Sequence, residues 1–340
     1  MLKIGIVGYG GMGRFHAENI LPKEKSIEIA GIYDILQRQM DLGERDGWKT
    51  YHSYEEMLSD PKVDIVLIAT ENDIHKELAI QAFKKGKHVI CEKPVTLSAV
   101  DFDIMIANAY EYGCYLFVHQ NRRWDKDFII LQELLEENEI GTVLKIESRA
   151  QGDHGIPSGW REYKRHGGGM LLDWGVHLID QVVTMCKAPV ESVYGTLSYV
   201  LGSEADDGFT TFLKYNSGLE VEINVDTTNY IKQPRWYIKG TKGTILLNDW
   251  DMQGEIVKVT KEVDKNKIKA IQAGAGLTHT LAPLPEDVLV KEDFPQTPQK
   301  MPSSFYENVC DVILNHAEPL IKHSEIREVL VLMEAIFKSS

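Results

Sequence analysis

The sequence predicts an α/β protein in which a doubly wound parallel sheet is followed by a second domain built on an antiparallel sheet. A chain of 340 residues is long enough for two domains, each with its own core. In the first 120 residues, short apolar runs alternate with stretches of helical spacing, a pattern that requires crossover connections and gives a parallel sheet. From about Gly141 onward the runs are longer and rich in β-branched and aromatic residues, as in antiparallel strands.

The N-terminal elements follow from these runs. Apolar residues recur at helical spacing between the expected strands, for example at Ile74, Leu78 and Phe83. The buried strands are expected at residues 3–7, 27–33, 63–69, 88–91 and 115–118.

The C-terminal part contains two short segments typical of hairpin loops, at residues 215–219 and 240–243. Residues 252–302 are polar and turn-rich and predict no definite element, whereas amphipathic helices are expected at 304–314 and 324–338. The strands are expected at residues 143–150, 190–201, 209–215, 219–227, 235–239 and 244–247.

Composition excludes several classes of partner. The formal net charge of −14 would repel both nucleic acid and an anionic membrane surface. No apolar run reaches the roughly 18 residues that span a bilayer, and the N-terminus enters a strand without a signal-like segment. We therefore expect a cytoplasmic protein. Its cysteines lack the spacing of a zinc site or a disulfide framework, so no metal is expected; they are Cys91, Cys114, Cys186 and Cys310.

A glycine-rich turn follows the first expected strand, and its sequence, GYGGMG at residues 8–13, matches the dinucleotide fingerprint GxGxxG. Gly8 permits a tight turn, Gly10 lets the backbone approach a pyrophosphate, and Gly13 allows close packing of helix on strand. Gly11 and Met12 lie at the start of the helix, whose N-terminus attracts the anion. The alternative is a turn with no ligand.

Asp34 ends the second strand about 20 residues after this motif, where a carboxylate accepts hydrogen bonds from the adenosine ribose. The same carboxylate would repel a 2′-phosphate, and Arg38 lies one turn away without a basic pair beside it. The sequence therefore predicts NAD as the cofactor, with NADP less favoured.

A third set of polar residues follows the third strand. Thr70, Asn72 and His75 lie at the carboxyl edge of the parallel sheet, where open α/β folds bind ligands, and we expect them to contact the cofactor. Asn72 or Asp73 could equally cap the following helix.

The fourth strand ends in Cys91-Glu92-Lys93-Pro94 at the same edge. The ammonium group of Lys93 could hold a substrate oxygen on which charge develops. Glu92 is expected to contact the cofactor or to pair with a cation. The alternative for Lys93 is an ordinary solvated lysine at a strand end.

A glycine run at residues 167–169 precedes an apolar helix that carries Asp173 and His177 four residues apart, on one face. Oxidation of an alcohol requires a proton acceptor, and histidine titrates near neutrality. We predict that His177 takes the hydroxyl proton and that Asp173 orients it or holds a neighbouring hydroxyl. Lys93 could instead be the base, and both helix residues could be structural. The glycines allow a close approach to the backbone.

Taken in order, these residues resemble the Gfo/Idh/MocA oxidoreductases, a family that includes inositol dehydrogenases and glucose–fructose oxidoreductase. One departure is Glu71, which stands where the family often has proline. The motifs that carry the resemblance are GYGGMG at 8–13, ATENDIH at 69–75, CEKP at 91–94, HQNRRWD at 119–125, GGGMLLDWGVHLID at 167–180 and IKGTKGTI at 238–245.

The resemblance implies a Rossmann domain over residues 1–122 and a substrate-binding α/β domain with an open, mainly antiparallel sheet over residues 123–340. It also implies oxidation or reduction of a secondary hydroxyl of a sugar, inositol or related polyol, with Lys93, Asp173 and His177 acting on the substrate. The outer face of such a sheet commonly forms a dimer or tetramer contact. Alternate residues in 209–215 and 220–226 are apolar enough for a partner to bury them.

Residues 153–166 form the expected specificity loop. Arg123, Trp160, Arg161 and Tyr163 could line a pocket with ring faces and charged donors, which suits a carbohydrate or a sugar acid. Trp160 could instead pack beneath the sheet, and Arg161 could be solvated.

Two other functions fit the same residues. One is a redox-neutral enzyme that retains NAD and returns the hydride to its substrate, with glycoside cleavage or isomerisation as the net reaction. The other is a nonenzymatic NAD-binding regulator, although such a protein has no need of Lys93, Asp173 and His177 together.

Overall fold

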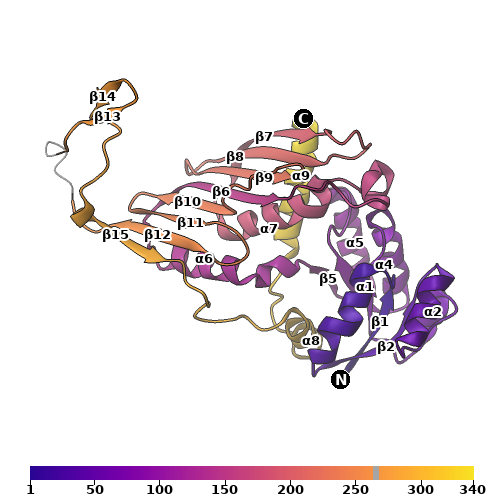
Figure 1. The fold of residues 1–340 in the computed structure, drawn as a ribbon. Helices are drawn as coiled ribbons and strands as arrows, with labels where there is room; N and C mark the ends of the chain where they lie inside the picture. The colour runs from indigo at the N-terminus through magenta and orange to yellow at the C-terminus, as the bar shows by residue number, and fades with distance from the viewer. Residues whose placement is uncertain (263–267) are drawn as a thin grey trace.

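A computed structural model describes residues 1–262 and 268–340, and two sheets organise this part of the chain (Figure 1). The strands of the N-terminal sheet are all parallel, in the order β2-β1-β3-β4-β5. They are β1 (Leu2–Val7), β2 (Ile27–Tyr33), β3 (Ile65–Ile68), β4 (His88–Glu92) and β5 (Leu116–His119). The chain leaves β1 toward β2 on one side and returns to β3 on the other. This reversal opens a crevice at the carboxyl edge.

Helices connect these strands. Ser53 and Ser98 cap α3 and α5, since their hydroxyls accept hydrogen bonds from the backbone N–H groups of Glu56 and Asp101. The helical segments are α1 (Gly11–Phe15), the π-helical η1 (His16–Ile20), η2 (Leu21–Lys23), α2 (Gln37–Arg45), α3 (Tyr54–Ser59), η3 (Asn72–Ile74), α4 (His75–Lys84) and α5 (Ala99–Glu111).

The second sheet has the order β15-β12-β11-β10-β6-β9-β8-β7, and its neighbours are antiparallel except for β6 and β9. The predicted α/β class, with a parallel and a mainly antiparallel sheet, is confirmed. Its strands are β6 (Val143–Gln151), β7 (Val190–Ser198), β8 (Gly208–Tyr215), β9 (Glu220–Asp226), β10 (Trp236–Gly240), β11 (Gly243–Leu247), β12 (Gly254–Val259) and β15 (Leu289–Asp293).

Residues 252–302, for which no element was predicted, supply the strands β12 and β15 at one edge of this sheet. Between them the chain forms a small hairpin of β13 (Ile271–Ala273) and β14 (Gly276–Thr278), which projects from the body of the molecule (Figure 1).

The last two helices return to the N-terminal part of the chain. α9 packs against β7 and α7 of the second domain and also against α5 of the first. α8 lies against the first domain, where the Tyr306 hydroxyl contacts His16 of η1 and the Cys310 thiol contacts the Ser26 carbonyl oxygen just before β2. The remaining helical segments are η4 (Asn121–Trp124), α6 (Lys126–Glu136), η5 (Trp160–Glu162), η6 (Lys164–His166), η7 (Leu171–Gly175), α7 (Val176–Met185), η9 (Glu286–Val288), α8 (Phe305–Asn315) and α9 (His323–Ser339).

Within the described residues, no helix combines the length and the apolar character needed to cross a bilayer.

The outer face of the second sheet differs from the prediction. The apolar alternates of β8 and β9 point into the core, whereas Glu222 and its alternates face outward, because the helices cover the apolar side. Two outward aromatic residues, Phe212 and Tyr194, are register partners and about half exposed. The predicted reason for oligomer contact was therefore wrong. The core-facing residues are Phe209, Leu213, Tyr215, Val221, Ile223 and Val225.

Candidate active site

A cavity of about 870 Å³ lies at the carboxyl edge of the N-terminal sheet, a volume typical of ligand sites. Both domains line it, because η5 and η7 of the second domain face the strand ends of the first. The predicted site residues that line it are Gly8, Gly10, Gly11, Met12, Asp34, Thr70, Asn72, Glu92, Lys93, Trp160, Arg161 and Asp173. Those that do not are Gly13, His75, Arg123, Tyr163 and His177.

Two glycines of the turn are required by its close packing, and the other two border open space. Gly8 has a φ of +88°, and a Cβ there would lie 2.5 Å from the Ala69 carbonyl oxygen. A Cβ on Gly13 would lie 1.8 Å from the Gly8 carbonyl oxygen, so this glycine serves the packing of helix on turn. A Cβ on Gly10 or Gly11 would meet nothing within 4 Å. The turn thus leaves open space over its backbone, as a pyrophosphate requires.

The Asp34 carboxylate is held by the backbone. Oδ2 accepts a hydrogen bond from the Tyr9 N–H at 2.7 Å, and Oδ1 accepts one from the Leu36 N–H at 2.8 Å. Each oxygen keeps a lone pair for a ribose hydroxyl. Among the described residues, the lysines and arginines that line the cavity are Lys93 and Arg161, which lie at the β4 end. From β2 to β4 is three strand spacings, about 14 Å, so neither of these two cations lies beside Asp34.

Asn72 and His75 have structural partners. The Asn72 side-chain amide donates to the Gly167 carbonyl oxygen at 2.9 Å and so joins the two domains at the cavity wall. His75 is completely buried, and its Nδ1 and Nε2 lie 3.1 and 3.2 Å from the carbonyl oxygens of Pro94 and Thr70. His75 therefore ties two strand ends together in the interior, contrary to its predicted contact with the cofactor.

Lys93, Asp173 and Arg161 form a charged cluster at the β4 end of the cavity. The Lys93 ammonium donates to Asp173 Oδ1 at 3.1 Å and to the Asp173 carbonyl oxygen at 3.0 Å. Arg161 Nε donates to Asp173 Oδ2 at 2.9 Å. Burial alone would raise the pKa of Asp173, but the charges of Lys93 and Arg161 outweigh it and hold the pKa below its ordinary value. Asp173 is thus ionised at neutral pH.

The glycine run 167–169 positions this cluster by admitting the chain's own atoms. A Cβ on Gly168 would lie 2.3 Å from the Arg161 carbonyl oxygen, and one on Gly169 would lie 2.0 Å from Asp206 Oδ1. Asp206 Oδ2 also accepts the Leu171 N–H at 2.9 Å, at the start of η7. The close approach predicted from the glycines therefore comes from the specificity loop and from Asp206.

His177 follows on α7, one helical turn from Asp173, and its side chain is 5% exposed. Burial lowers its pKa well below the ordinary value, and the nearby charges of Lys93 and Arg122 lower it further. The imidazole is therefore neutral at pH 7. Its Nδ1 has no hydrogen-bond partner within residues 1–262 and 268–340, and its ring lies 6.0 Å from that of Trp174.

The predicted substrate residues separate into two groups. Arg123 is buried, donating to both carboxylate oxygens of Asp180 at 2.6 and 2.8 Å and to Glu325 at 2.7 Å. The prediction that it lines a pocket is wrong, since three charge-assisted hydrogen bonds hold it inside the second domain. Trp160 lines the cavity with the Arg161 guanidinium 4.4 Å from its ring centre, whereas Tyr163 is 43% exposed and lies outside the cavity wall.

Sequence reasoning missed the apolar wall near Asp34. Ile35 and Leu36 follow this acid directly and are exposed although apolar, a signal visible in the sequence as two large apolar residues after a strand end. The cavity-lining residues not predicted are Val7, Tyr33, Ile35, Leu36, Gln39, Tyr54, Ala69, Glu71, Ile74, Leu78 and Gln81.

Two family models match separate parts of the chain. Residues 2–120 match the family described as "Oxidoreductase family, NAD-binding Rossmann fold", and residues 128–246 match the "GFO/IDH/MocA C-terminal domain". These matches cover more than half of the chain and confirm the resemblance inferred from its motifs. The N-terminal domain is an NAD-binding Rossmann domain.

Individual relatives are similar over most of the chain. A crystal structure of an NAD-binding protein from Listeria innocua is 47% identical with a TM-score of 0.96, covering 100% of this chain and 97% of that one. A myo-inositol 2-dehydrogenase from Thermotoga maritima is 33% identical over 73% of this chain and 75% of its own length. A scyllo-inositol 2-dehydrogenase (NADP(+)) from Bacillus subtilis is 26% identical over 77% of this chain and 73% of its own length.

Proposed function

The chain belongs to the GFO/IDH/MocA oxidoreductase family and is an NAD(P)-dependent dehydrogenase, and from that premise we propose that it transfers a hydride between nicotinamide and a secondary hydroxyl of a sugar, inositol or sugar acid. The observation that carries this proposal is the Lys93–Asp173 contact at the β4 end of the cavity, with neutral His177 on the next helical turn. The two inositol dehydrogenases among its relatives support the substrate class.

Lys93 holds the substrate oxygen in this proposal. An ammonium group has three donors, and Asp173 occupies two of them, through its carboxylate and its carbonyl oxygen. The third is left for a hydroxyl that becomes a carbonyl, and the positive charge stabilises the negative charge that develops on that oxygen. Asp173 fixes the position of the ammonium group.

Although His177 does not line the cavity in this structure, it follows Asp173 by one helical turn, and we assign it as the acceptor of the hydroxyl proton when the substrate is oxidised. Its lowered pKa keeps the ring unprotonated at neutral pH, which is the form that a general base requires. Bound NAD supplies the hydride acceptor. Trp160, beside Arg161 in the cavity wall, offers the apolar ring face that carbohydrate rings pack against.

NAD is the preferred cofactor in this proposal. The glycine turn would hold the pyrophosphate and Asp34 the adenosine ribose. The absence of a lysine or arginine near Asp34 in the lining of the described cavity disfavours a 2′-phosphate.

The test is a panel of sugars, inositols, sugar acids and glycosides offered with NAD and with NADP, followed through the absorbance of the reduced cofactor. We expect reduction of NAD with at least one polyol and loss of that activity in Lys93→Met. Lys258→Met is the matched control, because Lys258 is also ion-paired and partly buried but lies in β12 of the second sheet. Product formed without net reduction of NAD would favour the NAD-retaining alternative. No turnover with any of these substrate classes would favour the alternative of a nonenzymatic NAD-binding regulator.

We further propose that the protein forms a homodimer or homotetramer through the outer face of its second sheet, around Phe212 and Tyr194. Phe212→Lys should lower the mass measured by light scattering to that of the monomer. A monomer mass for the unaltered protein at all concentrations would contradict this.

A further inference from the structure

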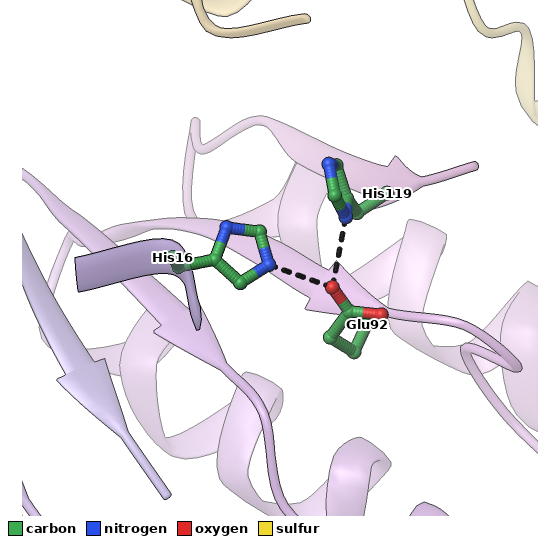
Figure 2. Close-up of side chains that lie close together, drawn as sticks. All are labelled: His16, Glu92 and His119. Atoms are coloured by element: carbon green, nitrogen blue, oxygen red, sulfur yellow. Dashed lines mark hydrogen bonds and ion pairs between the residues drawn. The ribbon is translucent and has the colours of Figure 1, made fainter. Parts of the chain in front are cut away.

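A cluster of buried titratable side chains lies next to the candidate active site and has no part in the proposed proton transfer. Glu92 Oε1 is 2.7 Å from His16 Nε2 and 2.8 Å from His119 Nδ1 (Figure 2). Each of the three side chains is at most about 6% exposed. Glu92 and His119 end the adjacent parallel strands β4 and β5 as register partners, so their side chains emerge on the same side of the sheet.

A fourth residue joins the cluster from the far end of the chain. The Tyr306 hydroxyl of α8 is 2.7 Å from His16 Nδ1. Because the Glu92 carboxylate can only accept, the His16 proton lies on Nε2, and Nδ1 accepts a hydrogen bond from the Tyr306 hydroxyl. We call these four residues, Tyr306, His16, Glu92 and His119, the Glu92 tetrad.

The spacing in the tetrad indicates hydrogen bonds and not metal ligands. Tetrahedral zinc ligands at about 2.0–2.1 Å from the ion are about 3.3 Å apart. The two N···O distances of 2.7 and 2.8 Å are shorter and match charge-assisted hydrogen bonds to a carboxylate. Two donors on one oxygen keep a buried carboxylate ionised, where burial alone would favour its neutral form.

The ionised Glu92 also faces the cavity. Its second oxygen is 3.2 Å from the backbone nitrogen of Lys93, and Glu92 is part of the cavity wall. Among the described residues, the charged side chains that line the cavity are the cations Lys93 and Arg161 and the carboxylates Asp34, Glu71, Glu92 and Asp173. Both cations pair with Asp173, whereas Glu92 is held by His16 and His119.

We propose that the Glu92 tetrad fixes a permanent negative charge at the nicotinamide end of the cavity and thereby favours the oxidised over the reduced cofactor. A nicotinamide ring is cationic when oxidised and neutral when reduced, so an anion beside it discriminates between the two forms. In this arrangement His16, His119 and Tyr306 are positioning residues that act through Glu92. The proposal depends on the binding of NAD and not on the identity of the substrate.

The experiment measures the dissociation constants of NAD⁺ and NADH separately and without substrate, using the fluorescence of NADH and its displacement by NAD⁺. Glu92→Gln, which keeps the shape and removes the charge, should raise the ratio Kd(NAD⁺)/Kd(NADH) about tenfold. Tyr306→Phe removes a single hydroxyl that lies in the interior of the tetrad, and should raise the ratio about threefold by freeing the His16 tautomer. Glu111→Gln, on the exposed end of α5, makes the same charge change as a control and should leave the ratio unaltered.

Circular dichroism establishes whether each variant is folded. If Glu92→Gln does not fold, the ratio measured for Tyr306→Phe tests the proposal. The proposal is overturned if the ratio stays within twofold of the unaltered protein, or if the two constants change equally, which a merely structural role would produce. About one equivalent of metal per purified chain that is lost in His119→Gln would also overturn it. Because no substrate is present, these outcomes are independent of the sugar panel.

Discussion

The contact between Lys93 and Asp173 predicts a measurable coupling energy. Asp173→Asn would remove a charge that two cations share, at 3.1 Å from Lys93 and 2.9 Å from Arg161. Both side chains of the Lys93 pair are about 14% exposed, whereas Arg161 is one-third exposed, so solvent screens its contribution more strongly. A hydrogen bond to a charged group contributes about 1.5–3 kcal/mol.

We therefore expect Asp173→Asn to lower the free energy of unfolding by about 3 kcal/mol, of which about 2 kcal/mol is coupling to Lys93. The assay is a double-mutant cycle of Lys93→Met and Asp173→Asn, with unfolding in urea followed by tryptophan fluorescence. The control is Asp103→Asn, which breaks the exposed pair of Asp103 with Arg327 on the helices α5 and α9 and should cost less than about 1 kcal/mol.

A coupling energy below about 0.5 kcal/mol would refute the reasoning, because it would mean that Asp173 does not hold the Lys93 ammonium in solution. If Asp103→Asn lowered the free energy of unfolding as much as Asp173→Asn does, the reasoning would also be refuted, since burial would then have no part in the effect.

Three further predictions follow from the cofactor end, the base and the buried histidines. Asp34→Ala should weaken NAD by about tenfold or more and NADP much less, measured as KM for each; an unaltered protein that already prefers NADP would contradict this. His177→Ala should lower kcat by about a hundred- to ten-thousandfold with little change in the Kd of NAD. In a plot of kcat against pH, the unaltered enzyme should lose activity on the acidic side only well below pH 6.5, because burial lowers the pKa of His177. If the variant loses activity over the same acidic range, His177 is not the titrating group. Burial lowers the pKa of His16, His75 and His177. Below about pH 6.5 the unfolded chain therefore binds more protons than the folded chain. The free energy of unfolding should fall on acidification by up to about 1.4 kcal/mol per pH unit for each of these histidines. Burial raises the pKa of Asp206 to about 6, so this one carboxyl group makes the folded chain more stable as the pH falls, opposite to the three histidines. A free energy of unfolding that rises between about pH 6.5 and 5.5 would show that Asp206 outweighs them.

The elements with strong local signals could be predicted from the sequence. The N-terminal strands, the glycine turn and the acid after β2 depend on short-range pattern, and the structure has Gly8, Asp34 and Lys93 along one cavity wall. The alternation in β8 and β9 defined two faces but not which of them the helices cover, because that depends on how α7 and α9 return to the sheet. The prediction for the outer face failed for this reason.

The side chains that were misassigned are those whose partners lie far away in the sequence. Arg123 pairs with Asp180 and Glu325, which are 57 and 202 residues distant, and no local pattern reveals that both carboxylates converge on it. The position of His75 after a strand end predicts an accessible ring, but the ring is buried against the carbonyl oxygens of Pro94 and Thr70. No local pattern reveals the Glu92 tetrad either, since Tyr306 is 290 residues from His16.

The return of α8 and α9 to the first sheet has a consequence for how the protein is made. The strands of the Rossmann domain are complete once residue 119 has been synthesised, but its buried His16 and the Asp103 of α5 still lack their partners, Tyr306 and Arg327. A ribosome that adds about 5–20 residues per second needs roughly 10 to 40 s more to reach α8. During that interval the nascent first domain exposes the surface that α8 and α9 later cover, and we expect it to be the stage at which chaperones bind.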